Sequence, residues 1–171
     1  MPTPSISIII PTHNRFEDLR RTLEAIDCQP NCDPELEVIV VDDDSTDNTR
    51  QLAQIRRSCQ FIYLPQAKVG ATAARNIGAS AARGRILVFM DDDIELMPGG
   101  LEALTNAHML WPSAIVLGRL VEPMAMALVD RSSEPSVVAK RMATDEFLIV
   151  SYSQCKTGLL CIGSDYATLV L

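Results

Sequence analysis

Four short apolar runs set a repeating pattern along the first half of the chain. They occupy residues 6–10, 36–41, 61–64 and 86–90, and each is followed by Pro or Asp. Runs of this length with many β-branched residues predict strands. The first, second and fourth are almost continuously apolar, which is typical of strands that are buried on both faces of a sheet.

Helical periodicity fills the gaps between these runs. Asn14, followed three residues later by Glu17, has the pattern of a helix N-cap. Beyond this cap, apolar residues recur at a spacing that places them on one face of a helix. These residues are Phe16, Leu19, Leu23 and Ile26.

Three more helices are predicted further along the chain. One begins at Ser45 or Thr46, an Ala-rich one covers residues 71–82, and Pro98 suits the first residue of the last. The inward-facing residues of the first and last of these are Leu52 and Ile55, and Leu101, Leu104 and Ala107. Strands that alternate with such short crossovers predict an α/β domain with a mainly parallel sheet.

The pattern weakens beyond Gly118. Residues 121–140 contain two prolines and a Ser-Ser pair, which favour irregular structure, whereas residues 158–163 favour one more strand. Length agrees with a single domain, because the chain has 171 residues, of which 47% are hydrophobic.

Charge and processing signals narrow the class of protein. The formal net charge is −7, which argues against a protein that binds mainly nucleic acid or an anionic membrane surface. The start shows no signal peptide and no apolar stretch reaches the ~20 residues of a membrane span. Five cysteines without a C-x-x-C pair favour reduced thiols in the cytoplasm, with a zinc site at Cys28 and Cys32 as the alternative. Peripheral contact with the inner face of the membrane is compatible with this location.

Two acidic triplets follow predicted strands, at residues 42–44 and 91–93. Because ligands of open parallel sheets bind at the carboxyl ends of the strands, these triplets mark a candidate site. Clustered carboxylates repel one another unless a cation compensates, and a hard divalent cation, Mg²⁺ or Mn²⁺, prefers oxygen ligands. The alternative is that the aspartates are helix caps and solvated loop residues.

Complementary charge comes from the Ala-rich helix. Arg75 lies one turn into that helix, near its positive end, and suits a diphosphate or a polarised base. The alternative is an arginine that faces solvent. Asn76 and Gly78 are poor helix formers and indicate close packing at this helix. His13 is interpreted as a loop residue near the sheet edge, and His108 as a favourable charge at a helix end.

Four segments together resemble the successive signatures of family 2 glycosyltransferases. They are residues 8–15 (IIIPTHNR), 40–49 (VVDDDSTDNT), 74–78 (ARNIG) and 88–93 (VFMDDD), within a resemblance that covers roughly residues 5–118. The resemblance implies a GT-A fold: residues 1–120 would form the nucleotide-sugar-binding α/β subdomain and residues 121–171 a partial acceptor-side region. It also implies a metal-assisted, inverting transfer of a sugar from a nucleoside diphosphate to an acceptor hydroxyl.

The resemblance also implies roles for individual residues. Asp43 would accept a hydrogen bond from the base, Asp91 would face the ribose or the metal, and Asp93 would bind the divalent cation. The full set of implied nucleotide-binding residues is Pro11, Thr12, Asn14, Asp43, Arg75 and Asp91. One departure is Asp44, where the family usually has Gly or Asn.

The acceptor side departs further from the family. No convincing copy of the motif that carries the catalytic base follows Asp93, and Asp145, in the adjacent acidic pair Asp145-Glu146, is the candidate base. The expected donor is of the UDP type and the acceptor a glycan or a lipid-linked molecule, as in polysaccharide biosynthesis. A second hypothesis is a catalytically incomplete binding module, completed by a partner chain or an oligomer.

A third hypothesis comes from another class of enzyme. Residues 42–46 also match the D-x-D-x-T element of haloacid-dehalogenase-like phosphatases, in which Asp42 would be the nucleophile. That scheme leaves the segments at residues 11–15 and 75–78 unexplained. A dinucleotide-binding Rossmann domain is disfavoured, because no G-x-G-x-x-G follows the first strand.

Overall fold

The computed structural model describes residues 5–30, 36–55, 57–110, 114–118, 150–151 and 168–170. Its strands are β1 (Ile6–Thr12), β2 (Leu36–Asp43), β3 (Gln60–Gln66), β4 (Ile86–Met90), β5 (Ala114–Gly118), β6 (Val150–Ser151) and β7 (Thr168–Val170). Its helices are α1 (Phe16–Asp27), α2 (Ala71–Ala81) and α3 (Gly100–Leu110), with a 3-10 helix, η1 (Asn48–Gln54).

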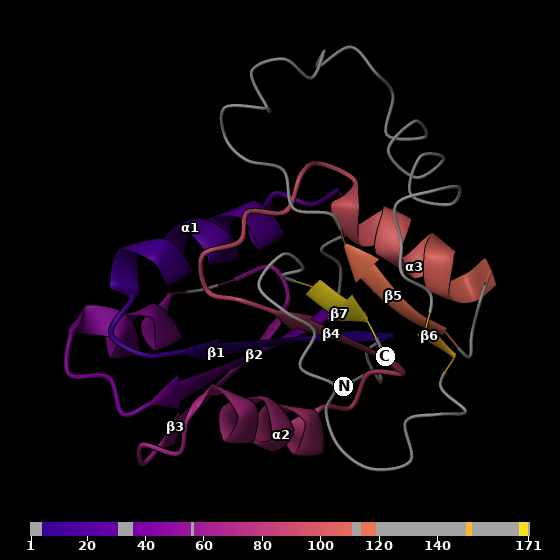
Figure 1. Cartoon of the computed structure of the whole chain (residues 1–171). Helices are drawn as coiled ribbons and strands as arrows, with labels where there is room; N and C mark the ends of the chain where they lie inside the picture. Colours follow the sequence, from indigo (N-terminus) through magenta and orange to yellow (C-terminus); the bar gives the residue numbers. More distant parts are fainter. Residues whose placement is uncertain are drawn as a thin grey trace.

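The strands form one sheet in the order β3-β2-β1-β4-β7-β5-β6 (Figure 1). The first four in this order are parallel to one another, which confirms the predicted α/β architecture and all four predicted strands. The strand β7 is antiparallel to both β4 and β5. Every residue of β1 and β2 is buried, because these two central strands are covered on both faces.

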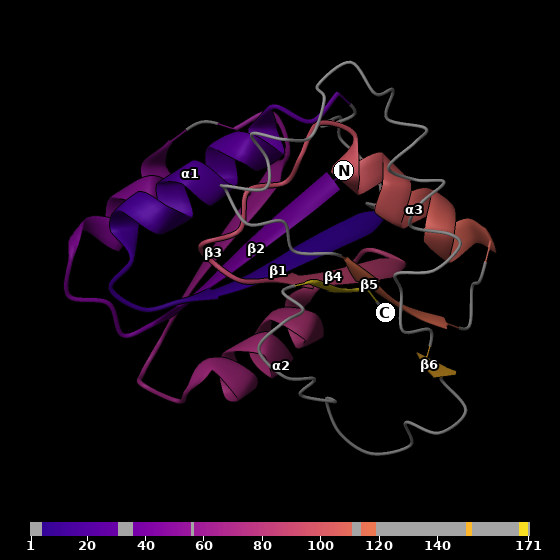
Figure 2. The ribbon, with the colours of Figure 1, turned by 45° about the horizontal axis from the view of Figure 1, so that its top comes forward.

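Helices cover the two faces of the sheet unequally. α1 and α3 lie over one face and α2 over the other (Figure 2). The first face buries the larger core, to which α1 contributes Leu19, Leu23 and Ile26, each at most 1% exposed. Burial of each such side chain stabilises the fold by about 1.5–3 kcal/mol. The predicted inward face of α1 is therefore confirmed, with Phe16 packed at its margin.

On the opposite face, α2 approaches the sheet closely. A Cβ added to Gly78 would lie 2.4 Å from Ile9 Cγ2 and 3.2 Å from Val41 Cγ2. Ala74, one turn earlier, is completely buried against the same strands. The small residues of α2 thus allow its close approach, as predicted for Gly78, whereas Asn76 is exposed.

Two predicted helix starts are wrong. Asn14 is not the cap of α1: Arg15 occupies the N-cap position without a side-chain hydrogen bond, and Asp47 Oδ2 accepts from Phe16 N at 3.1 Å. Pro98 precedes α3 rather than opening it, because Gly99, with φ of 79°, completes a turn before the helix begins at Gly100. In the first case a residue distant in sequence supplies the cap, which a local pattern cannot reveal.

The second predicted helix differs in kind. It is the 3-10 helix η1, which begins at Asn48 because Asp47 is its N-cap and accepts from Thr49 N at 2.9 Å. Leu52 is buried as predicted, but Ile55 lies beyond the helix, in extended backbone, and is 48% exposed. The inward prediction for Ile55 is therefore wrong.

Several predictions fall outside the described residues. The irregular region at 121–140, the extra strand at 158–163 and the candidate base Asp145 all lie there. The boundary between a nucleotide-sugar-binding part (1–120) and an acceptor-side part (121–171) remains a prediction.

Candidate functional site

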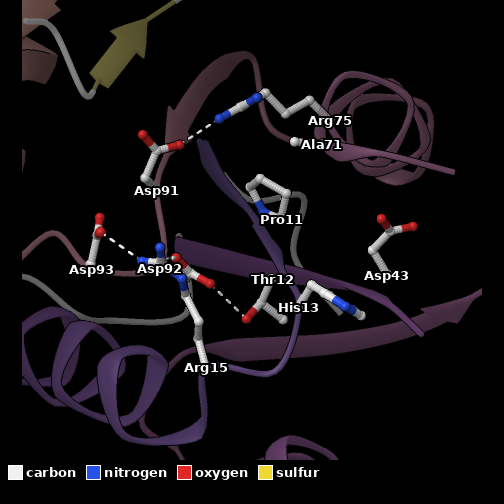
Figure 3. A pocket seen from close by; sticks show the side chains of 10 residues that line it. All are labelled: Pro11, Thr12, His13, Arg15, Asp43, Ala71, Arg75, Asp91, Asp92 and Asp93. Carbon is white, nitrogen blue, oxygen red and sulfur yellow. Dashed lines mark hydrogen bonds and ion pairs between the residues drawn. The ribbon is translucent and has the colours of Figure 1, made fainter. Parts of the chain in front are cut away.

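A cavity of about 280 Å³ opens at the carboxyl ends of β1, β2 and β4, beside the first turn of α2. Figure 3 shows its lining, which combines the acidic triplet 91–93 and one member of the other triplet, Asp43, with two arginines. The lining residues are Pro11, Thr12, His13, Arg15, Asp43, Ala71, Arg75, Asp91, Asp92 and Asp93. This is the edge at which parallel α/β sheets bind their ligands.

The aspartates that follow β4 differ in their surroundings. Asp92 is 8% exposed, and its Oδ2 accepts from Thr12 Oγ1 at 2.8 Å. Burial raises the pKa of Asp92, although the hydrogen bond from Thr12 and the charge of Arg15 act in the opposite direction. The side chains of Asp91 and Asp93 are 43% and 49% exposed. Asp92 therefore anchors the segment, while its two neighbours present carboxylates at the cavity.

Each of these two exposed carboxylates is paired with one arginine (Figure 3). Arg75, on α2, donates from Nη2 to Asp91 Oδ1. Arg15, in the loop between β1 and α1, donates from Nη1 to Asp93 Oδ2 at 2.7 Å and lies 3.5 Å from Asp92 Oδ1. Sequence reasoning assigned no role to Arg15. The signal that could have found it is a basic residue just after a strand that neighbours β4 in a parallel sheet.

The three aspartates at the end of β2 have different surroundings, and two of them do not line the cavity. Asp42 is 4% exposed, with Oδ1 accepting from Ser45 N at 2.9 Å and Oδ2 from the Tyr63 hydroxyl. Burial and the bond to Asp42 raise the pKa of Tyr63. Asp44 is exposed and has φ of 68°, a left-handed conformation. That conformation favours Gly and Asn, which explains the family's usual residues at this position.

Asp43 is the member of this triplet that lines the cavity. Its Oδ1 accepts from Val69 N at 2.6 Å and its Oδ2 from Gly70 N at 3.0 Å. The loop can present these amides because Gly70 adopts φ of 84°, which suits a residue without a side chain. Since a carboxylate offers about four acceptor positions, the two backbone bonds fix Asp43 and leave acceptor capacity toward the cavity.

The loop that follows β1 places His13 and Asn14 differently. His13 lines the cavity, and its buried Nδ1 has no hydrogen-bond partner among the described residues. Asn14 is not among the lining residues: with φ of 55°, it turns Oδ1 to Thr46 N at 2.7 Å and Asp47 N at 3.3 Å. Asn14 therefore joins two loops at the edge of the site.

The carboxylate oxygens of the site fit a hard divalent cation such as Mg²⁺. No group of three or more His, Cys, Asp and Glu able to hold a metal occurs among the described residues. Mg²⁺ is usually held by one or two carboxylates together with substrate phosphates, and Asp91 and Asp93 offer two such carboxylates.

For the zinc alternative, Cys28 is an exposed free thiol, and Cys32 lies outside the described residues. The helices of the described part include none that is long and apolar enough to cross a membrane.

Comparison with solved structures defines the class of protein. The chain resembles S. aureus TarS in complex with UDP, with a TM-score of 0.61 and 27% identity over 68% of this chain and 38% of that one. It also resembles the mannosyltransferase PcManGT from Pyrobaculum calidifontis in complex with GDP-Man and Mn²⁺, with a TM-score of 0.60 and 28% identity over 74% of this chain and 38% of that one. The fold is therefore the GT-A fold of glycosyltransferases.

The chain belongs to glycosyl transferase family 2, whose sequence model matches residues 7–157. Among curated relatives, the validoxylamine A glucosyltransferase of Streptomyces hygroscopicus subsp. limoneus is 33% identical over 119 residues, which are 67% of this chain and 26% of the relative. The chain thus spans about a quarter of that relative's length.

Proposed function

We propose that the chain transfers a sugar from a nucleoside diphosphate to an acceptor hydroxyl with the aid of a divalent cation. The observation that carries the proposal is the gathering of Asp43, Asp91, Asp93 and Arg75 around one cavity at the carboxyl edge of the sheet. Two structural neighbours support it, since their structures hold UDP or GDP-Man with Mn²⁺. We favour UDP-type donors, because the similar protein TarS has been solved both with UDP and with UDP-GlcNAc.

The residues around the cavity would divide the donor between them. Asp43, already fixed by two backbone amides, would accept a hydrogen bond from the base. Pro11 and Thr12 would line the nucleotide pocket, and Arg75 would lie along the diphosphate. Asp93, together with Asp91, would hold the divalent cation. When bound, that cation supplies Lewis-acid stabilisation of the charge on the departing nucleoside diphosphate.

Calorimetric titration of UDP and of GDP, each with and without Mn²⁺, tests the donor site. We expect one nucleotide to bind only with the metal, and Asp93→Asn to weaken that binding by about 100-fold, because it removes an anionic ligand of the metal. The matched control is Asp44→Asn. It removes the charge of an acidic residue that does not line the cavity, and asparagine tolerates the left-handed φ of this position. Undiminished binding in Asp93→Asn would refute the metal-binding role assigned to Asp93.

Turnover separates the enzyme from the incomplete binding module. Inverting transfer requires a base that deprotonates the acceptor hydroxyl, and Asp145 stays our candidate. We expect release of UDP from a UDP-sugar in the presence of an acceptor, abolished by Asp145→Asn with donor binding retained. Donor binding without any transfer or hydrolysis in the wild type would instead favour the module with a partner chain. A glycan or lipid-linked acceptor and a cytoplasmic location remain parts of this proposal.

The phosphatase hypothesis is not supported. Its nucleophile would be Asp42, which is buried, bonded to Ser45 N and the Tyr63 hydroxyl, and absent from the cavity lining. A nucleophile must reach its substrate, and the carboxylate that faces the cavity from this triplet is Asp43 instead.

A further inference from the structure

Arg15 is held at its backbone, whereas its side chain takes no part in the start of the helix. Its carbonyl oxygen accepts from Leu19 N at 2.9 Å, as the first hydrogen bond of α1. Its side chain makes no capping bond, is 48% exposed and extends to Asp93. A change of this side chain therefore leaves the start of the helix in place.

The position of this guanidinium conflicts with a cation on the same carboxylate. Arg15 Nη1 lies 2.7 Å from Asp93 Oδ2 and 3.5 Å from Asp92 Oδ1. A divalent ion on Asp93 would face a like charge within a few ångströms, where repulsion is strong even at a protein surface. We therefore expect Arg15 to leave Asp93 when the ion binds, since an exposed ion pair costs little to break.

A diphosphate would offer the released guanidinium a new partner. The cavity holds four carboxylates and two arginines, so it lacks positive charge for an anionic ligand. The fork of N–H donors on an arginine matches phosphate oxygens and can donate two parallel hydrogen bonds to them.

We propose that Arg15 is an exchangeable counter-ion: it neutralises Asp93 before ligands bind and contacts the diphosphate of the donor once a divalent cation occupies Asp93. The inference rests on the proposed function, which places the cation on Asp93. It goes beyond that function because it makes Arg15 a competitor of the metal and a positioning residue of the donor.

This exchange predicts effects of opposite sign in one variant. In Arg15→Gln, Mn²⁺ alone should bind about two- to fivefold more tightly, because its competitor is gone. With Mn²⁺ saturating, the nucleotide should bind about tenfold more weakly, because a charged hydrogen bond to the diphosphate is lost. Arg15→Lys keeps the charge. Its Mn²⁺ affinity should be close to that of the wild type, and its nucleotide affinity should lie between those of Arg15→Gln and the wild type.

The experiment is calorimetric titration of the 171-residue chain, first with MnCl₂ and then with UDP or GDP at saturating Mn²⁺. The matched control is Arg21→Gln, since Arg21 pairs with Asp18 on the exposed side of α1 and does not line the cavity. Both affinities of this control should equal those of the wild type.

The outcomes separate the two levels of the proposal. A wild type that binds neither nucleotide with Mn²⁺ overturns the proposed function and the role of Arg15 with it. A wild type that binds, beside an Arg15→Gln variant indistinguishable from Arg21→Gln, overturns the role of Arg15 alone. Weakening of both ligands in Arg15→Gln, with an altered melting temperature, also overturns it, because a structural role produces that pattern.

Discussion

Carboxylates meet arginines at both edges of the parallel sheet, in two different environments. At the amino edge, Glu37 is completely buried and accepts from Ser7 Oγ at 2.7 Å, from Arg83 N at 3.0 Å and from Arg83 Nη2 at 2.6 Å. At the carboxyl edge, Asp91 and Asp93 are nearly half exposed, and each pairs with one arginine across the cavity.

The difference in burial separates an ion pair that stabilises the fold from two ion pairs that are accessible at the cavity. The Glu37 network continues to Gly84, whose N–H donates to Ser7 Oγ at 2.9 Å and whose Cβ, if added, would lie 2.6 Å from Ser7 N. When such a buried carboxylate is removed, its buried donors lose their acceptor, and this lowers the stability of the fold. An exposed pair contributes little and keeps acceptor positions that a ligand can use.

The largest expected effect breaks the amino edge. Glu37→Ala should lower the free energy of unfolding by about 3 kcal/mol, because it leaves the buried hydroxyl of Ser7 without its acceptor and breaks the hydrogen bonds from the half-exposed Arg83. The same measurement by urea denaturation should show a change of less than about 0.5 kcal/mol for Asp91→Asn at the carboxyl edge. Similar losses in the two variants would contradict the distinction between the edges.

A smaller effect tests a structural carboxylate at the carboxyl edge. Asp47 caps η1 through Thr49 N and closes the start of α1 through Phe16 N. Asp47→Ala should therefore cost about 1–2 kcal/mol of unfolding free energy, whereas Asp47→Asn, which keeps one acceptor oxygen, should cost less. Wild-type stability in Asp47→Ala would show that these caps are replaced by water.

The smallest effect is one of pH. Burial acts to raise the pKa of Glu37, but the hydrogen bonds from Ser7 and Arg83 outweigh it and hold that pKa below its ordinary value of 4.5. The folded chain therefore binds this proton less readily than the unfolded chain. The stability that Glu37 contributes is present above pH 4.5 and is lost as the pH falls through the lowered pKa.

We expect the unfolding free energy to fall less steeply from about pH 5 to about pH 3 in Glu37→Gln than in the wild type. Urea denaturation at each pH measures this slope. Exposed Glu24→Gln, on α1, controls for the removal of one carboxylate. Equal slopes in the two variants would mean that the folded and unfolded chains bind the Glu37 proton equally.

The four parallel strands, the Ala-rich helix and the two acidic triplets could be predicted from the sequence, because apolar periodicity and the residues at strand ends are local properties. Gly78 could be identified as a packing position for the same reason. The cap of α1 could not, since Asp47 reaches Phe16 from another loop. Nor could the exposure of Ile55, which depends on where η1 ends.

The sequence by itself determined the order of strands and helices, and it placed carboxylates after β2 and β4, because hydrophobic runs and polar strand ends are written along the chain. The tertiary structure alone decided which carboxylates remain available. It kept Asp42 out of the cavity lining and tied Asp92 to Thr12, while Asp43, Asp91 and Asp93 line the cavity and Arg15 pairs with Asp93. Burial and pairing arise between segments that the parallel sheet brings together, and no single segment encodes them.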